Sequence, residues 1–335
     1  MDPATGTLLA VVVATALVFA AVNGAHDASD VIATPVVTGA LTPLMALVIA
    51  AVLNGLGGLL GSRLAETVAY GVLTPLDGAA GLVLVLSALL GAIAWNAFTW
   101  WRGIPSSSTH ALVGGLAGAG AVVGASVDWT RAGLQVALPL LVSPLLGFVV
   151  AGSVALAVAW VLRHAAPGRA HRAFRYAQVV SSSGVAVGHG LQDAQKTMGV
   201  LLLALVAAGA LPHGSGVPWW VTASASGALA LGTLAGGWRI VRTLGERITT
   251  VDPAAGFAAE ATTTGVLALS AAGLGVPVST TQTVTAAIAG AGAVRRPSAV
   301  RLRVLRRIVG FWVLTAPASA AAGALCAAAL LPLLG

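Results

Sequence analysis

Long apolar stretches set the strongest limit on what this chain can fold into. Hydrophobic residues make up 58% of its 335 residues and charged residues only 8%, too few for the charged surface of a soluble protein. The apolar stretches, several of them near the roughly 20 residues that cross a bilayer as a helix, cover residues 41–60, 82–98, 138–162, 200–211, 217–238 and 308–334. We predict an all-α polytopic membrane protein with about 10–12 crossing or half-crossing elements, because isolated strands leave backbone groups unbonded in lipid.

The formal net charge of +7 comes mainly from arginines in short clusters between the apolar stretches. Such clusters are typical of the cytoplasmic ends of membrane helices and not of a nucleic-acid-binding face, so we expect no nucleic-acid partner. We place the densest clusters, residues 163–175 and 295–307, inside the cell and both sparsely charged termini outside, in a multi-pass protein of the cell membrane. The single cysteine, Cys326, has no partner for a disulfide within the chain and is expected to pack in the core.

The chain resembles itself in three stretches that occur in the same order in both halves. The corresponding pairs are Asn23 to Asp30 with His189 to Lys196; Gly61, Arg63 and Thr67 with Gly237, Arg239 and Thr243; and Pro105 to His110 with Pro277 to Gln282. An ordered set of matches predicts two structural repeats, residues 1–162 and 176–335, joined by the basic linker 163–175. Since the linker is predicted inside and the termini outside, each repeat crosses an odd number of times. The two repeats are then inverted relative to each other.

Asp27 and Asp193 occupy corresponding places just after short apolar runs flanked by glycines. Charge inside a membrane segment is costly, so such residues are candidates for function. Short segments interrupted at matching places also predict broken helices, whose free carbonyls could join a carboxylate in binding a cation or a proton. The coupling-ion candidates are Asp27, Asp193 and their neighbours His26, Gln192 and Asn23, with a possible sodium at Asp27 and Asp193. The structural alternative is that Asp27 only caps the following helix.

Two hydroxyl-rich stretches follow Pro105 and Pro277, and each leads into a helix of small residues. Free N–H groups and the dipole at a helix start bind phosphate without requiring a basic side chain. Two such starts facing each other in a pair of inverted, re-entrant hairpins could enclose one tetrahedral oxyanion. The candidate phosphate ligands are Ser106, Ser107, Ser108, Thr109, Ser279, Thr280 and Thr281. The alternative is that these residues merely cap the two helices.

Further polar residues inside apolar surroundings are candidates for transport. Lys196, the only lysine, aligns with Asp30, and we expect it to pair with Asp30 or Asp193. Glu66 and Glu260 are equally compatible with a functional and a structural role. His110 and Gln282 close the two hydroxyl-rich stretches.

With these motifs the chain resembles the PiT family of cation-coupled inorganic phosphate transporters. That family has a Gly-x-Asn-Asp-type motif in each half, which corresponds here to Gly24–Asp27 and Gly190–Asp193, and a Pro-x-Ser-Thr-type motif in each hairpin. The resemblance covers nearly the whole chain. It implies inverted repeats with two re-entrant hairpins, a homodimer, symport of phosphate with sodium or protons, and a transport role for Glu66 and Glu260. The sequence departs from the family at His26, Gln192 and Gln282.

Two other classes of function are compatible with parts of the sequence. Ser107, His110 and Asp27 could be imagined as a hydrolase triad. The sequence contains neither the Gly-x-Ser-x-Gly nor the His-Glu-x-x-His motif of hydrolases, and a hydrolase does not explain why the serine-rich stretch occurs twice. A passive anion channel has no need for paired intramembrane aspartates. We therefore predict a phosphate symporter that is not an enzyme and has no cofactor. His26 stands beside Asp27, and an imidazole is the side chain that ordinarily exchanges a proton around neutral pH, so we favour protons over sodium as the coupling ion.

Overall fold

The computed structural model describes residues 2–71, 74, 76–126, 128, 130, 132–295 and 297–334, and every regular element in these ranges is helical. Ten of the described helices have 16 residues or more. Their bounds are α1 Pro3–Val37, α2 Pro43–Gly58, α4 Gly78–Arg102, α5 Ser108–Val123, α7 Leu138–Val161, α8 Pro167–Ala207, α9 Trp219–Ala235, α11 Pro253–Ala268, α12 Thr280–Arg295 and α13 Leu302–Leu330. Two short helices, α3 Arg63–Tyr70 and α10 Trp238–Arg242, complete the framework. The prediction of an all-α protein is confirmed.

Five described helices are long and apolar enough to cross a membrane. They are α1, α4, α11 with its π-helical extension to Leu274, α13, and the segment Ala132–His164 that contains α7. A sixth span is possible if α2 and α3, which meet at an angle of 72°, count as one broken crossing. The 16 residues of α5 extend over only about 24 Å, less than the roughly 30 Å of a hydrocarbon core. A half-crossing hairpin accounts for this length.

The helices of the two halves follow one another in the same order. A long helix (α1 or α8) is followed by a shorter one (α2 or α9), a short bent segment (α3 or α10), a longer helix (α4, or α11 with its π-helical extension), a 16-residue helix (α5 or α12) and a final long helix (α7 or α13). The halves also exchange partners: α13 packs on α4 and α5 of the first half, and α7 packs on α11 and α12 of the second. The pairs α1–α9 and α8–α2 are exchanged in the same way.

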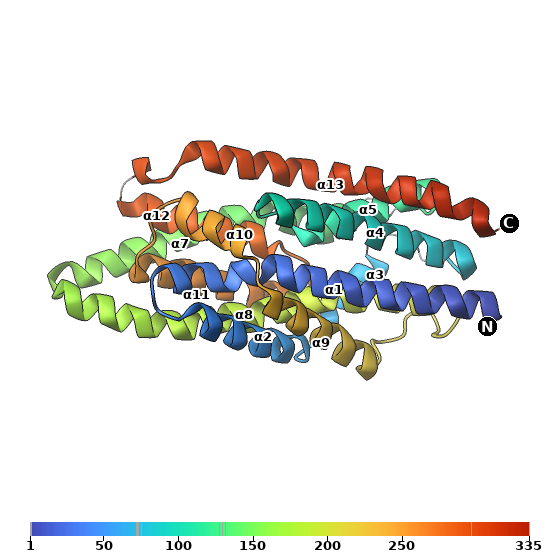
Figure 1. Ribbon diagram of the computed structural model, residues 1–335, viewed down its shortest axis with the longest axis horizontal. Coiled ribbons are helices and arrows are strands. Elements are labelled where there is room, and N and C mark those ends of the chain that lie inside the picture. The colour runs from blue at the N-terminus through green and yellow to red at the C-terminus, as the bar shows by residue number, and fades with distance from the viewer. Residues whose placement is uncertain are drawn as a thin grey trace.

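The ends of the chain lie at one end of the bundle, and the basic linker lies at the other (Figure 1). Helix α1 runs from the end with the termini toward the linker, whereas its counterpart α8 runs in the opposite direction (Figure 1). The C-terminal end of α12 and the N-terminal end of α13, the helix whose first two turns carry Arg303, Arg306 and Arg307, lie at the same end as the linker. This arrangement is what an inverted repeat would produce. The inverted symmetry, and the side of the membrane on which each end lies, stay predictions.

The prediction of unwound helices at Asp27 and Asp193 is wrong. Both residues lie inside uninterrupted helices, α1 and α8. Unwinding is not needed because the carboxylates take their hydrogen bonds from side chains of neighbouring helices, so the helical backbone can keep its own bonds. The interruptions occur elsewhere, between α2 and α3 and at Gly236 after α9, where φ is +65°.

The glycines of the two aspartate motifs serve close packing instead of unwinding. A Cβ atom on Gly24 would lie 2.2 Å from the carbonyl oxygen of Leu229 in α9, and one on Gly190 would lie 2.0 Å from that of Asn54 in α2. These contacts repeat at corresponding places in the two halves. Small residues therefore bring α1 onto α9 and α8 onto α2, which fixes the helices that carry Asp27 and Asp193.

We predict that Gly24→Ala and Gly190→Ala each destabilise the protein by about 1–3 kcal/mol, because the added methyl group must push backbone away in a packed interface. Thermal unfolding of the purified protein in detergent measures the effect. Gly227→Ala is the matched control, because a Cβ atom at this position in α9 meets nothing within 4 Å. Equal unfolding temperatures for all three variants and the unsubstituted protein would contradict this role of the glycines.

Candidate functional site

Four buried charged residues gather where α1 and α8 pack together. Asp27 and Asp30 lie on α1, and Asp193 and Lys196 lie on α8; none of the four is more than 2% exposed. Three carboxylates against one ammonium group leave two formal negative charges if the nearby histidines are neutral. Such a charge is costly in the low dielectric of a membrane protein unless hydrogen bonds or cations compensate for it.

Hydroxyl groups at the starts of α5 and α12 donate hydrogen bonds to all three carboxylates. Ser108 donates to Asp27 Oδ2 at 3.1 Å. The hydroxyl of Thr281 lies 2.8 Å from Asp30 Oδ2 and 3.3 Å from Asp27 Oδ1. Thr280 donates to Asp193 Oδ1 at 3.3 Å. The two hydroxyl-rich stretches thus meet the two aspartate motifs.

Lys196 links the two halves. Its Nζ atom lies 2.9 Å from Asp193 Oδ1 and donates hydrogen bonds to Ser108 Oγ at 2.8 Å and Thr109 Oγ1 at 3.2 Å. The predicted pairing with Asp193 is therefore present, and Asp30 instead bonds Thr281. Asp30 aligns with Lys196, and Thr281 aligns with Thr109. The contact of Asp30 with Thr281 therefore corresponds to the contact of Lys196 with Thr109, with the opposite charge on the partner of the threonine.

The two hairpin starts also touch each other directly. The hydroxyl of Thr109, in the first turn of α5, lies 3.4 Å from the carbonyl oxygen of Val278, just before α12. Ser108, Thr109, Thr280 and Thr281 are all at most 2% exposed. The sequence prediction that the two helix starts face each other agrees with these contacts.

Two histidines lie beside the carboxylates, one in each half. His26 Nδ1 is 2.6 Å from Asp27 Oδ1, and His26 Nε2 is 3.1 Å from Thr99 Oγ1. His189 Nε2 is 3.2 Å from Asp193 Oδ2, and His189 Nδ1 is 3.1 Å from Asn54 Oδ1. Each imidazole thus has a carboxylate oxygen near one ring nitrogen and a polar side chain of a neighbouring helix near the other.

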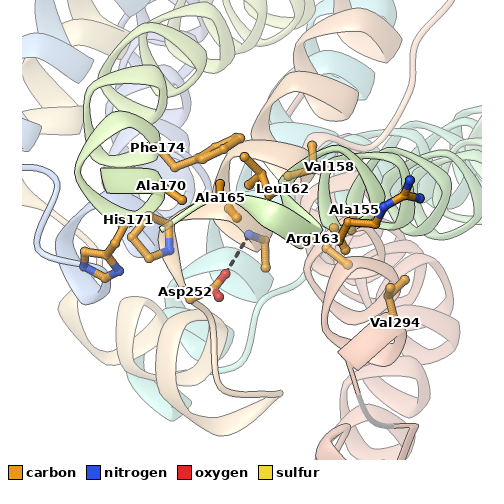
Figure 2. A pocket seen from close by; sticks show the side chains of 15 residues that line it. Ala155, Val158, Leu162, Arg163, Ala165, Ala170, His171, Phe174, Asp252 and Val294 are labelled. Carbon is orange, nitrogen blue, oxygen red and sulfur yellow. Dashed lines mark hydrogen bonds between the residues drawn. The ribbon is translucent and has the colours of Figure 1, made fainter. Parts of the chain in front are cut away.

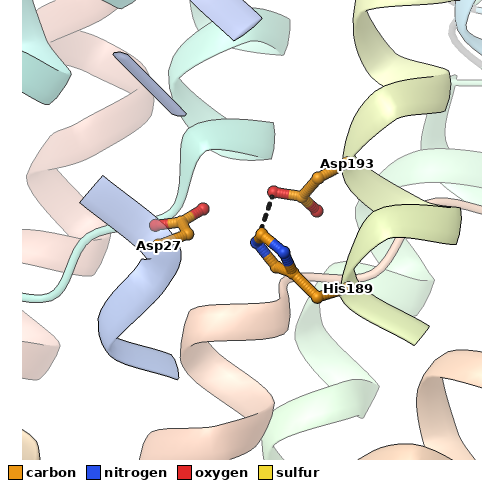
Figure 3. Close-up of side chains that lie close together, drawn as sticks. All are labelled: Asp27, His189 and Asp193. Carbon is orange, nitrogen blue, oxygen red and sulfur yellow. Dashed lines mark ion pairs between the residues drawn. The ribbon is translucent and has the colours of Figure 1, made fainter. Parts of the chain in front are cut away.

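The carboxylates of Asp27 and Asp193 converge on one small region together with His189 (Figure 3). One ligand atom from each of the three residues lies within 4.8 Å of the others. Three further buried oxygens on α1 and α8 lack a hydrogen-bond donor among the described residues: Asn23 Oδ1, Asp30 Oδ1 and Gln192 Oε1. Carboxylate and amide oxygens are the ligands of hard cations, so these residues fit either a bound sodium ion or a proton.

Ser107 and Ser279 cap the helices that follow them, which is the structural alternative to binding phosphate. Ser107 Oγ accepts a hydrogen bond from the backbone N–H of His110 at 3.2 Å and lies 2.8 Å from His110 Nδ1. Ser279 Oγ accepts from the backbone N–H of Gln282 at 3.2 Å. Both serines are therefore helix caps. The hydroxyl of Ser106 lies 2.7 Å from that of Thr99 on α4 and 3.3 Å from Nε2 of His26, so Ser106 contacts the histidine beside Asp27 and not the carboxylates.

The contacts of Asp27 argue against a hydrolase triad. His110 contacts Ser107, but Asp27 contacts His26 and orients no histidine toward that serine.

The two amide candidates for the coupling-ion site make different contacts. Gln192 donates to Ser270 Oγ at 2.5 Å, and Asn23 donates to Asp193 Oδ2 at 2.8 Å. Asn23 therefore supports the carboxylate cluster directly, whereas Gln192 bonds the π-helical segment that follows α11.

Glu260 and Glu66 differ in environment. Glu260 is 3% exposed, and its carboxylate accepts hydrogen bonds from Thr34 at 2.6 Å, Gln178 at 3.0 Å and Ser181. It belongs to a separate polar network between α1, α8 and α11. Glu66 is exposed in the first turn of α3 and contacts none of the cluster residues described above.

Sequence reasoning missed His189, Thr99 and Asn54 as members of the site. His189 had a usable signal, because it aligns with Asn23 and precedes Asp193 by one helical turn. Asn54 and Thr99 had none, because each comes from a helix without a repeated polar motif and meets the histidines only through packing.

Comparison with known proteins identifies the family to which the chain belongs. The model of the phosphate transporter family matches residues 23–323. The chain is 46% identical over 323 residues to a probable low-affinity inorganic phosphate transporter of Rhizobium meliloti, covering 95% of each chain. A protein of the same description from Bacillus subtilis is 35% identical over 319 residues, covering 95% of this chain and 96% of the relative. A solved structure described as the sodium-dependent phosphate transporter superposes with a TM-score of 0.86 at 25% identity, covering 97% of this chain and 99% of the other. The chain is a multi-pass membrane protein and belongs to the phosphate transporter family.

Proposed function

We propose that this protein is a secondary active symporter that moves inorganic phosphate across the cell membrane together with a cation. The names of its relatives supply the substrate and the class of activity. The observation that carries the proposal is that hydroxyls of both hairpins, the expected phosphate ligands, are bonded to the carboxylates that would bind the cation. We further propose a homodimer, as the family resemblance implies, and termini that lie outside the cell, as the distribution of arginines predicts.

Competition for hydroxyl protons would couple the two substrates. A hydroxyl has one O–H donor, so Ser108 cannot donate to Asp27 and to phosphate at the same time. A cation or proton at Asp27 and Asp193 lowers the demand of the carboxylates for donors and removes part of the negative charge. The hydroxyls and Lys196 can then turn to an oxyanion. Phosphate is thus excluded until a cation is bound, which is the requirement for symport.

The phosphate would bind between the starts of α5 and α12. Ser108, Thr109, Thr280 and Thr281 offer hydroxyl donors there, and Lys196 offers up to three N–H donors. The free backbone N–H groups at the two helix starts add a favourable dipole. The caps Ser107 and Ser279 would set the direction of these helix starts without contacting the anion.

Protons are our first candidate for the coupling ion, because His26 forms a buried contact with Asp27 where the family resemblance leads one to expect asparagine. Sodium is the second candidate, because the protein with the similar solved structure is sodium-dependent. Uptake of labelled phosphate into proteoliposomes at fixed pH separates the two. We expect uptake to persist when choline replaces sodium and to stop when an uncoupler collapses the proton gradient. Uptake that follows sodium and ignores the uncoupler at zero membrane potential would show sodium coupling and a structural role for His26.

We predict that Asp27→Asn and Asp193→Asn each abolish cation-driven accumulation of phosphate, because each keeps the shape of the side chain but removes the charge that binds the cation. Phosphate binding to these variants, measured by calorimetry, should also lose its dependence on the cation, since an amide does not hold the hydroxyls as a carboxylate does. Size-exclusion chromatography controls for folding. Accumulation at the level of the unsubstituted protein in either variant would rule out these residues as the coupling centre.

Loss of the cluster hydroxyls should weaken phosphate binding. For Ser108→Ala combined with Thr281→Val we expect an increase of about tenfold or more in the KM for phosphate, because each hydrogen bond to a charged ligand contributes about 1.5–3 kcal/mol. Ser107→Ala combined with Ser279→Ala is the matched control: it removes two helix caps and should lower thermal stability while the KM stays within about twofold of its original value. If the cap variant raises the KM and the cluster variant does not, phosphate binds elsewhere.

A further inference from the structure

A cavity of about 210 Å³ beside the first hairpin loop is lined by four arginines from three different elements. Arg102 ends α4, Arg247 ends the π-helical turn Thr243–Arg247, and Arg303 and Arg307 lie in the first two turns of α13. All four residues are exposed. At roughly 30 Å³ per water molecule, the cavity has room for a small oxyanion with part of its hydration shell.

These arginines carry positive charge without compensation from the protein. Within the part of the chain that the structure describes, none of the four forms an ion pair with a carboxylate; Arg102 instead stacks against the rings of Phe98 and Trp101, each 5.7 Å from its guanidinium carbon. Arg303 and Arg307 are one helical turn apart, so they repel each other, and they lie at the positive end of the α13 dipole. A bound anion would relieve both effects.

Membrane topology alone does not explain this arrangement. A positive-inside signal requires basic residues at one end of the bundle, but it does not require four of them around one cavity. A larger cavity of about 480 Å³ between α7, α8, α11 and α12 shows the contrast (Figure 2). Its walls are mostly apolar, Arg163 and His171 lie on opposite sides, and the Arg163 guanidinium is 4.4 Å from the centre of the Trp160 ring.

The arginine-lined cavity adjoins the backbone that leads to the candidate phosphate site. Gly103 and Ile104, which line it, directly precede Pro105 and the hydroxyl-rich stretch. Thr243, another lining residue, donates to the carbonyl oxygen of Gly103 at 2.7 Å, and Trp312 donates to that of Pro105 at 3.1 Å. An anion in the cavity would therefore contact the loop that positions Ser108.

We propose that Arg102, Arg247, Arg303 and Arg307 form a second anion site that binds a phosphate group, separate from the site around Ser108 and Lys196. Planar guanidinium groups match phosphate oxygens in paired hydrogen bonds, and groups from three elements can surround a tetrahedral anion. The phosphate group is either inorganic phosphate or the headgroup of an anionic phospholipid. For inorganic phosphate the proposal rests on the proposed function, and for the phospholipid headgroup it does not.

Binding of labelled phosphate to the protein in nanodiscs of phosphatidylcholine tests the first ligand. We expect the unsubstituted protein and the control Arg169→Gln with Arg172→Gln, two exposed arginines of α8 outside the cavity, to bind a second phosphate per chain. Arg303→Gln with Arg307→Gln should lose this second phosphate. Ser108→Ala with Thr281→Val should keep it, so a failure of the central site can be distinguished from a failure of the arginine site. The single change Arg247→Gln provides an independent variant if the double variant unfolds at a lower temperature.

Native mass spectrometry after reconstitution with phosphatidylglycerol tests the second ligand. If the headgroup is the natural occupant, the unsubstituted protein and the Arg169/Arg172 control retain phosphatidylglycerol, and both cavity variants lose it at least in part. Loss of either ligand specifically in the cavity variants supports the site and identifies its source. The proposal is overturned if the cavity variants bind phosphate and retain phosphatidylglycerol to the same extent as the control.

Discussion

Buried carboxylates in a membrane protein must find hydrogen-bond donors inside the protein, because lipid offers none. In this chain the donors to Asp27, Asp30 and Asp193 are hydroxyls at the starts of α5 and α12, helped by Asn23 and Lys196. This interaction ties the two long central helices to the two hairpins. It also brings the groups suited to a cation and the groups suited to an oxyanion into direct contact.

The near-symmetry of the site makes its one asymmetry meaningful. Asp30 with Thr281 in one half corresponds to Lys196 with Thr109 in the other, and the exchange of a carboxylate for an ammonium group places positive charge on one side only. The histidines are likewise unequal, since His26 contacts Asp27 from the neighbouring position and His189 reaches Asp193 from one turn away. An anion between the two halves would thus meet the ammonium group of Lys196 from one half. From the other half it would meet the carboxylate of Asp30, in a site whose negative charge a bound coupling ion reduces.

The sequence predicted the features that follow from composition and repetition: a helical membrane fold and the meeting of aspartate motifs with hydroxyl-rich helix starts. The inverted symmetry of the two halves stays a prediction. The sequence did not predict the state of the helices at Asp27 and Asp193. Glycine beside a charge can mean unwinding or close packing, and the continuous helix through Asp27, with no room for a Cβ atom between Gly24 and Leu229, separates the two. Nor does the sequence alone distinguish the roles of Ser107 and Ser108. A shift of one residue in where the helix begins would decide which hydroxyl caps the helix and which bonds Asp27. The four arginines of the second cavity converge from three elements, so no local pattern marks them.

The coupling account depends on hydroxyls that change partner when the cation binds. Structures of the protein with phosphate, determined in the presence and absence of the coupling cation, test this most directly. The account predicts density for phosphate within hydrogen-bonding distance of Ser108, Thr109, Thr281 and Lys196 only when the cation is present, with Ser108 and Thr281 turned away from Asp27. Phosphate density at this site without the cation, or with both hydroxyls still bonded to Asp27, would contradict it.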